Sequence, residues 1–104
     1  MTAEELKELV DRGAPIDLID IREPHEWDIV RIDGSRLVPK AEWLSGTAMA
    51  SLRPDRRPVF YCRSGVRSAE VLAAAHLAGF TEATHLEGGV VAWATRIDLS
   101  LPVY

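Results

Sequence analysis

The sequence predicts an α/β domain built on a central, mostly parallel β-sheet with helices on both faces. Short apolar runs that suit buried strands alternate along the chain with segments of helical periodicity, which is typical of parallel sheets. The predicted order is helix, strand, helix, strand, helix, strand, helix, strand, helix. A chain of 104 residues has the size of one domain, so residues 1–104 are expected to form a single domain with one active site.

The first half of the chain supplies two of the predicted strands. Residues 2–5 have the pattern of a capping box, and the helix that follows is expected to stop at Gly13. The apolar residues crowded into 16–21 suit a strand that is buried on both faces. Residues 24–27 fit a short helix with proline in its first turn, and a second strand-like piece follows around 37–38.

The second half of the chain predicts the remaining elements, closely spaced. They are a helical turn over 41–44, a polar turn over 53–58, a strand over 59–61, a helix over 69–77, a strand over 83–86 and a last helix over 90–95. Gly79 ends the alanine-rich helix, and Gly88 with Gly89 is expected to form a turn before the last helix.

Composition argues against several classes of partner. Hydrophobic residues make up 47% and charged residues 27% of the chain, as in ordinary globular proteins. No apolar stretch approaches the roughly 20 residues that span a bilayer, and the N-terminus lacks a secretory signal pattern. A cytoplasmic location without membrane contact is therefore expected, provided that the chain is complete. The net charge of -4 argues against nucleic acid as a partner.

Cysteine and histidine, two residue types that commonly bind metals, are few in this chain and far apart in the sequence. The chain has one cysteine, Cys62, so an intramolecular disulfide is impossible. His25, His76 and His85 do not have the spacing of a metal site or of a catalytic triad, and we expect them to face solvent or cap helices. No metal and no cofactor is predicted.

Cys62 lies where a predicted strand gives way to a helix that begins near Ser68. Ligands of open α/β sheets bind at such strand ends. The loop that follows the cysteine is predicted to bind the substrate and consists of Arg63, Ser64, Gly65, Val66, Arg67 and Ser68. Its N–H groups can surround the sulfur if Gly65 permits close backbone approach, and the helix N-terminus, Arg63 and Arg67 favour an anion. We therefore expect a reactive thiolate, and a cradle that also fits a persulfide.

Each of these residues also has a plainer interpretation. A lone cysteine is usually an inert apolar residue, but a strand end, a glycine, two arginines and a helix start within seven residues favour reactivity at Cys62. Arg67 taken alone would equally well be a surface or packing residue. Asp20 and Arg22 are expected to form an ion pair that holds the first strand's loop against the cysteine loop, with direct substrate contact as the alternative.

At this loop the sequence resembles a known family. The pattern Cys62-x-x-Gly65-x-Arg67-Ser68 resembles the active-site loop of the single-domain rhodaneses, which are thiosulfate-type sulfurtransferases. Three other family-like motifs occur in the expected order along the chain. Two lie before the loop, Asp20-x-Arg22-Glu23 with Glu26-Trp27 and Gly34 with Pro39, and one lies after it, Gly88-Gly89 with Trp93. The resemblance covers essentially the whole chain. It implies a rhodanese-like α/β fold, a persulfide at Cys62 and an anion-binding role for the loop.

One position departs from the family pattern. The family usually has a histidine before Ile-x-Gly, whereas this sequence has Arg31. We expect Arg31 to be structural, with a rearranged local contact.

A closer resemblance concerns the C-terminal rhodanese domain of sulfurylases that load sulfur-carrier proteins in molybdopterin and thiamine-related pathways. It is carried by residues 27–30, 65–70 and 102–104. It implies a sulfur-carrier protein and an adenylating domain as partners. The expected reaction has two half-reactions, in which Cys62 takes a sulfane sulfur from thiosulfate or another persulfide and passes it to a thiophilic acceptor or to the carrier.

Two other functions remain as alternatives. A cysteine-dependent phosphatase or arsenate reductase of related fold would have five residues between its cysteine and arginine, but here four residues separate Cys62 from Arg67. The smaller cradle should fit one sulfur better than a tetrahedral phosphate. A noncatalytic binding module of the same fold is the second alternative, although such modules often lack the cysteine.

Overall fold

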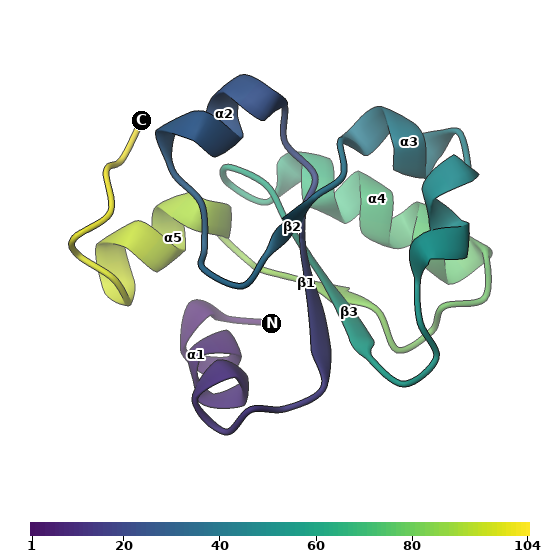
Figure 1. Ribbon diagram of the computed structural model, residues 1–104, viewed down its shortest axis with the longest axis horizontal. Helices are drawn as coiled ribbons and strands as arrows, with labels where there is room; N and C mark the ends of the chain where they lie inside the picture. Colours follow the sequence, from purple (N-terminus) through teal and green to yellow (C-terminus); the bar gives the residue numbers. More distant parts are fainter.

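The computed structural model describes all 104 residues and has a four-stranded sheet at its centre (Figure 1). The strands are β1 (Ile16–Asp20), β2 (Arg36–Leu37), β3 (Arg57–Tyr61) and β4 (Thr84–His85). They lie in the order β2-β1-β3-β4, and every neighbouring pair is parallel. The predicted α/β fold with a parallel sheet is confirmed.

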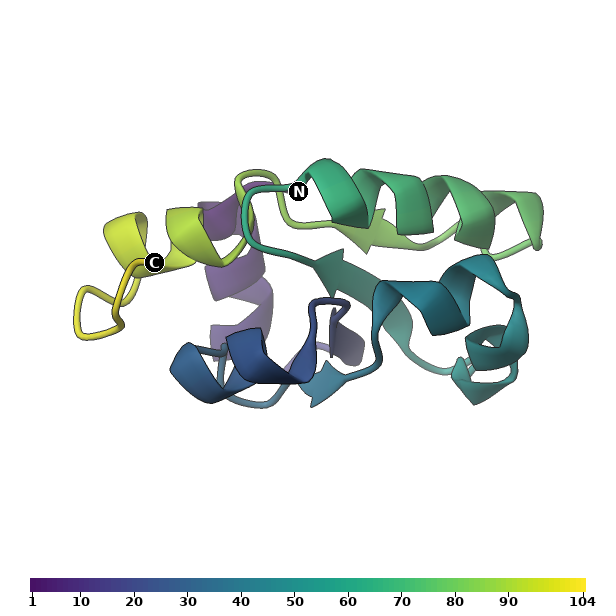
Figure 2. The ribbon, with the colours of Figure 1, turned by 90° about the horizontal axis from the view of Figure 1, so that it is seen from above.

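Helices cover both faces of the sheet, as predicted. They are α1 (Ala3–Asp11), α2 (Pro24–Ile29), α3 (Lys40–Leu44), α4 (Val66–Leu77) and α5 (Gly89–Arg96), with a 3-10 helix η1 (Thr47–Ser51). Figures 1 and 2 show α1 and α5 on one side of the sheet and α3, η1 and α4 on the other, while α2 lies near its carboxyl edge. None of these helices combines the length and apolar character needed to cross a membrane.

Side chains along each strand alternate between the two faces of the sheet, and the apolar core is divided into two clusters. Tyr61 packs in the apolar cluster that contains residues of α1 and α5, whereas Phe60 and Cys62 pack in the cluster that contains residues of α3 and α4. Successive side chains of a strand point to opposite faces, so one step along the chain changes the side. Cys62 therefore faces the side of the sheet that α4 covers, and its sulfur lies beside the N-terminus of that helix.

The element boundaries differ from the sequence prediction at several places. Helix α4 begins at Val66, three residues before the predicted range 69–77, because Gly65 caps it with a positive φ of 109°. Strand β3 begins at Arg57 and includes Pro58, which lacks an N–H group. This proline is tolerated because the pairing of β3 with β4 involves only Val59 and Phe60. Helix η1 was not predicted.

Candidate active site

The loop after β3 places two backbone N–H groups on the sulfur of Cys62. The N–H of Gly65 donates to Sγ at 3.1 Å, and the N–H of Ser68 donates at 3.4 Å. The Ser68 hydroxyl oxygen lies 3.5 Å from the same sulfur. These groups belong to the first turn of α4 and its cap, so the positive end of the helix dipole also points at the sulfur.

Gly65 is needed in this loop for a reason other than the predicted one. Its φ of +109° lies in the left-handed region that side chains disfavour. A Cβ added there would meet no atom closer than the Gly88 nitrogen at 3.4 Å, which is an ordinary contact. The backbone conformation, and not a close approach, therefore requires glycine at position 65.

The close backbone approach occurs at Gly89, in the first turn of α5. The N–H of Val90 donates to the carbonyl oxygen of Cys62 at 2.9 Å, and the N–H of Val91 donates to that of Arg63 at 3.1 Å. A Cβ at Gly89 would lie 2.4 Å from both carbonyl oxygens. The start of α5 thus holds the back of the cysteine loop, and only glycine fits between them.

The environment of Cys62 favours the thiolate despite burial. Cys62 is only 1% exposed, and burial alone would raise its pKa. The Ser68 hydroxyl and the N–H groups of Ser68, Gly65 and Ser64 outweigh burial, so the pKa of Cys62 lies below its ordinary value. Hydrogen bonds from these neutral donors are therefore the main favourable contribution to a sulfur anion at this position.

Arg67 is engaged by a carboxylate instead of standing free beside the sulfur. Its guanidinium donates to Glu26 Oε1 at 2.7 Å and to Oε2 at 2.9 Å, and Glu26 is buried on α2. The hydrogen bonds from Arg67 lower the pKa of Glu26 to about 2. Burial raises this pKa, and the hydrogen bond from Tyr104 lowers it further. Glu26 in turn raises the pKa of Arg67, and the Cys62 thiolate adds to this effect.

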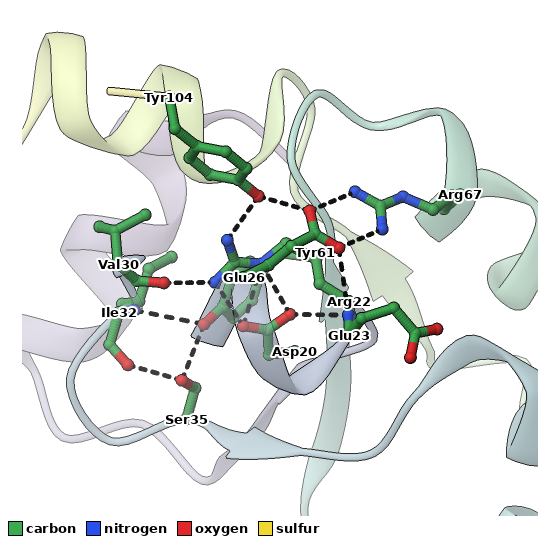
Figure 3. Close-up of polar contacts among 10 residues, drawn as sticks. All are labelled: Asp20, Arg22, Glu23, Glu26, Val30, Ile32, Ser35, Tyr61, Arg67 and Tyr104. Carbon is green, nitrogen blue, oxygen red and sulfur yellow. Dashed lines mark hydrogen bonds and ion pairs between the residues drawn. The ribbon is translucent and has the colours of Figure 1, made fainter. Parts of the chain in front are cut away.

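Tyr104 joins this ion pair to a second one (Figure 3). Its hydroxyl donates to Glu26 Oε2 at 2.6 Å and accepts from Arg22 Nη1 at 2.6 Å. Arg22 and Asp20 are both fully buried and form the predicted ion pair, with a shortest N–O distance of 2.7 Å. Hydrogen bonds connect the pair to the cysteine loop through Tyr104, which contacts Glu26, the partner of Arg67.

The other residues of the predicted loop are exposed to different degrees. Arg63 is exposed, and its guanidinium lies 4.9 Å from the centre of the Tyr104 ring and donates to the Tyr104 backbone oxygen. Ser64 is exposed, and Val66 is 71% exposed at the start of α4. Arg63, Ser64 and Val66 therefore form the outer rim of the loop, while Ser68 is fully buried beneath it.

The three histidines have three different environments. His25 and His76 are exposed, in agreement with the predicted solvent-facing role, and His76 Nε2 also lies 2.9 Å from the carbonyl oxygen of Ala83. The prediction is wrong for His85, whose Nδ1 lies 2.9 Å from the Ser68 hydroxyl oxygen.

Arg31 stacks on the ring of Trp27 at 4.6 Å, an exposed local contact that agrees with a structural role.

Three residues of this site were not assigned to it from the sequence: Glu26, Tyr104 and His85. Glu26 and Tyr104 lie in segments that carry the family resemblance, but nothing in their spacing shows that they meet. Glu26 is 41 positions from Arg67, and Tyr104 is 78 positions from Glu26. His85 has no distinctive spacing, so only the packing of β4 beside β3 reveals it.

Comparison with known proteins identifies the family. The protein-family model described as "Rhodanese-like domain" matches residues 2–96 of this chain. The chain is 50% identical over 104 residues to a Mycobacterium tuberculosis protein named "Probable adenylyltransferase/sulfurtransferase MoeZ". The match covers 100% of this chain but 26% of MoeZ, so this chain spans about a quarter of that relative.

Solved structures share the fold. A rhodanese-like domain protein from Staphylococcus aureus has a TM-score of 0.79 and 26% identity, with 100% of this chain and 96% of that chain covered. RPA3614 from Rhodopseudomonas palustris, described as a possible tyrosine phosphatase of unknown function, has a TM-score of 0.80 and 29% identity, with 99% and 82% covered. With a family match over nearly all of its length and the corresponding fold, the chain belongs to the rhodanese-like domain family.

Proposed function

We propose that this chain is a sulfurtransferase domain that carries sulfane sulfur as a persulfide on Cys62. The observation that supports this function best is the convergence of the Gly65 N–H, the Ser68 N–H and the Ser68 hydroxyl on one sulfur atom. This cradle lowers the pKa of the only cysteine in the chain. The thiolate is the nucleophilic form of cysteine, so the site is suited to attack on a sulfur donor.

The proposed reaction with thiosulfate has two balanced half-reactions. The Cys62 thiolate attacks the outer sulfur, a new S–S bond forms, and sulfite leaves with the electron pair of the old one. An acceptor such as cyanide then takes the outer sulfur of the persulfide as thiocyanate and restores the thiolate. We propose no metal or cofactor for either step.

We further propose an adenylated sulfur-carrier protein as the natural acceptor. The relative MoeZ combines "adenylyltransferase" and "sulfurtransferase" in its name, and this chain matches about a quarter of it. In the proposed step the outer persulfide sulfur attacks the adenylated carboxyl carbon of the carrier, and AMP leaves. A thiol reductant then cleaves the resulting disulfide, which releases the carrier thiocarboxylate and the Cys62 thiolate.

The phosphatase alternative is less well supported by this site. Four residues separate Cys62 from Arg67, one fewer than in phosphatase loops of related fold. Both Nη atoms of Arg67 donate to Glu26, so the charge of this side chain is already paired with a protein carboxylate and is less suited to a phosphate. The binding-module alternative leaves the lowered pKa of Cys62 unexplained.

Turnover with two substrates separates these functions. The purified chain is expected to convert thiosulfate and cyanide to sulfite and thiocyanate, and to leave aryl phosphates intact. Cys62→Ser should abolish the first activity. Aryl phosphate hydrolysis that depends on Cys62 and exceeds sulfur transfer would support the phosphatase, and inertness toward both substrates would support the binding module.

The acceptor is tested separately. Sulfur-loaded chain, an adenylating enzyme, ATP, a thiol reductant and candidate carrier proteins are mixed, and the carriers are weighed by mass spectrometry. A carrier thiocarboxylate that requires Cys62 is expected. If sulfur reaches small thiols but no carrier, the carrier proposal is wrong and a general sulfurtransferase remains.

A further inference from the structure

The Ser68 hydroxyl has one proton and three acceptors within reach. Its oxygen lies 3.5 Å from Cys62 Sγ, 3.3 Å from the Gly65 carbonyl oxygen and 2.9 Å from His85 Nδ1. Ser68 is fully buried, so water does not compete for this proton. The group that fixes the direction of the Ser68 proton therefore controls whether the sulfur receives a hydrogen bond from it.

We propose that His85 is a positioning residue for Cys62, because its Nδ1 directs the Ser68 hydroxyl toward the sulfur. This inference rests on the proposed function of Cys62. When Nδ1 carries a proton it donates to the Ser68 oxygen, and the Ser68 proton is then free to point at the thiolate. When Nδ1 is unprotonated it accepts the Ser68 proton, and the thiol S–H of Cys62 donates to the Ser68 oxygen.

The same chain gives a balanced path for deprotonation of Cys62. The S–H bond breaks and its proton moves to the Ser68 oxygen, while the original Ser68 proton moves to His85 Nδ1. The proton on His85 Nε2 then leaves to water, so the imidazole ends neutral in the other tautomer. No hydrogen bond joins Nε2 to another protein group, and His85 is half-buried, so the proposed path releases this proton to water.

The surroundings of His85 favour the neutral ring that such a switch requires. Burial lowers the pKa of His85, the amino group of Met1 adds to this effect, and Glu87 opposes it. The same amino group donates to the His85 carbonyl oxygen at 3.1 Å. On the Cys62 side the nearby cation is Arg67, whose charge is paired with Glu26.

The pairing of β4 with β3 places His85 beside the cysteine loop. His85 is the last residue of β4 and pairs with Phe60 of β3, two positions before Cys62. A Cβ at Gly65 would lie 4.0 Å from Cε1 of His85, so the imidazole ring faces the cap of α4. The contact therefore joins the end of β4 to the first turn of α4.

The experiment measures the alkylation rate of Cys62 against pH in matched variants. His85→Asn keeps a polar group near the position of Nδ1, whereas His85→Gln places it near that of Nε2 and His85→Leu removes both. Below the wild-type midpoint, His85→Leu and His85→Gln are expected to react about fivefold more slowly, as expected for the loss of one hydrogen bond to sulfur. His85→Asn should stay within about twofold of the wild type.

A second background tests the path through Ser68. In a Ser68→Ala protein, His85→Leu is expected to cause no further slowing, because the connecting hydroxyl is absent. Equal profiles for wild type, His85→Gln and His85→Asn would overturn the proposal, as would a further slowing by His85→Leu in the Ser68→Ala background. The comparison of Asn with Gln decides the matter even if His85→Leu does not fold.

Alkylation does not require sulfur transfer, so the two proposals fail in different ways. A wild-type chain that takes up no sulfur, but shows the predicted alkylation differences, would contradict the proposed function and leave the role of His85 in place. Normal sulfur uptake with identical alkylation profiles would contradict only the role of His85.

Discussion

Arg67 and Glu26 form a two-pronged ion pair, with N–O distances of 2.7 and 2.9 Å, that joins the start of α4 to α2 at the carboxyl edge of the sheet (Figure 3). The sequence alone suggested that the Arg67 charge serves the sulfur directly. In the structure this charge is paired with a buried carboxylate, so Arg67 chiefly fixes the loop, and the hydrogen bonds from N–H and hydroxyl groups are the main causes that lower the pKa of Cys62.

The first prediction concerns the coupling of this pair. Arg67→Ala and Glu26→Gln are each expected to lower the free energy of unfolding by about 1 to 3 kcal/mol, because each leaves a charged partner unmatched. The double variant should cost about as much as one single variant, as measured by urea unfolding. Arg67→Lys should not restore stability, since lysine cannot bind both oxygens at once. Additive losses would show that the pair is not coupled.

The second prediction is a pH dependence of stability that Glu26 carries. Its folded pKa of about 2 lies below the roughly 4.3 of an unfolded glutamate. Its contribution is therefore present above about pH 4.3 and is lost as the pH falls toward the folded pKa. The stability difference between wild type and Glu26→Gln should shrink between about pH 5 and about pH 3. A difference that stays constant over this range would contradict the assignment.

The third prediction tests the bridging hydroxyl of Tyr104. Tyr104→Phe keeps the ring but removes the acceptor of Arg22 and a donor to Glu26. Since Arg22 is fully buried, the loss should destabilise the fold by about 1 to 3 kcal/mol in urea unfolding. The neighbouring Val103→Ala, at a residue 56% exposed, should change stability by less than about 0.5 kcal/mol. Equal effects of the two substitutions would show that the hydroxyl does not bridge the ion pairs.

The fourth prediction compares two glycines with positive φ. Gly79→Ala meets no atom within 4 Å, so only backbone strain of about 1 to 2 kcal/mol is expected. Gly89→Ala adds contacts of 2.4 Å with the carbonyl oxygens of Cys62 and Arg63, and should cost about 3 kcal/mol or more. It should also slow sulfur uptake, because the loop must shift. Similar stability and uptake in both variants would show that α5 does not hold the loop.

The general fold was predictable because it depends on local patterns. The capping box at the start of α1 is present, with Thr2 Oγ1 accepting from the Glu5 N–H at 3.1 Å. The apolar run forms strand β1, in which Leu18, Ile19 and Asp20 are buried, and β2 and β3 pair with it on either side. Strand β4 is shorter than predicted, since only Thr84 and His85 pair with β3.

The site was predictable only as far as it is continuous in the chain. The cysteine, the glycine cap and the helix start lie within residues 62–68, so their joint geometry follows from one loop. The partners of Arg67 and Ser68 come from α2, β4 and the segment after α5, and no local pattern indicates which carboxylate or imidazole arrives there. Positive φ at Gly65 and steric contact at Gly89 are likewise properties of the folded backbone.

The most direct test of sulfur transfer is the intact mass of the protein after exposure to thiosulfate. Because Cys62 is the only thiol, the wild-type chain is predicted to gain the mass of one sulfur atom, and cyanide should remove it. Cys62→Ser should gain nothing under the same conditions. A wild-type mass that stays unchanged, or a Cys62→Ser protein that still takes up and transfers sulfur, would contradict the account.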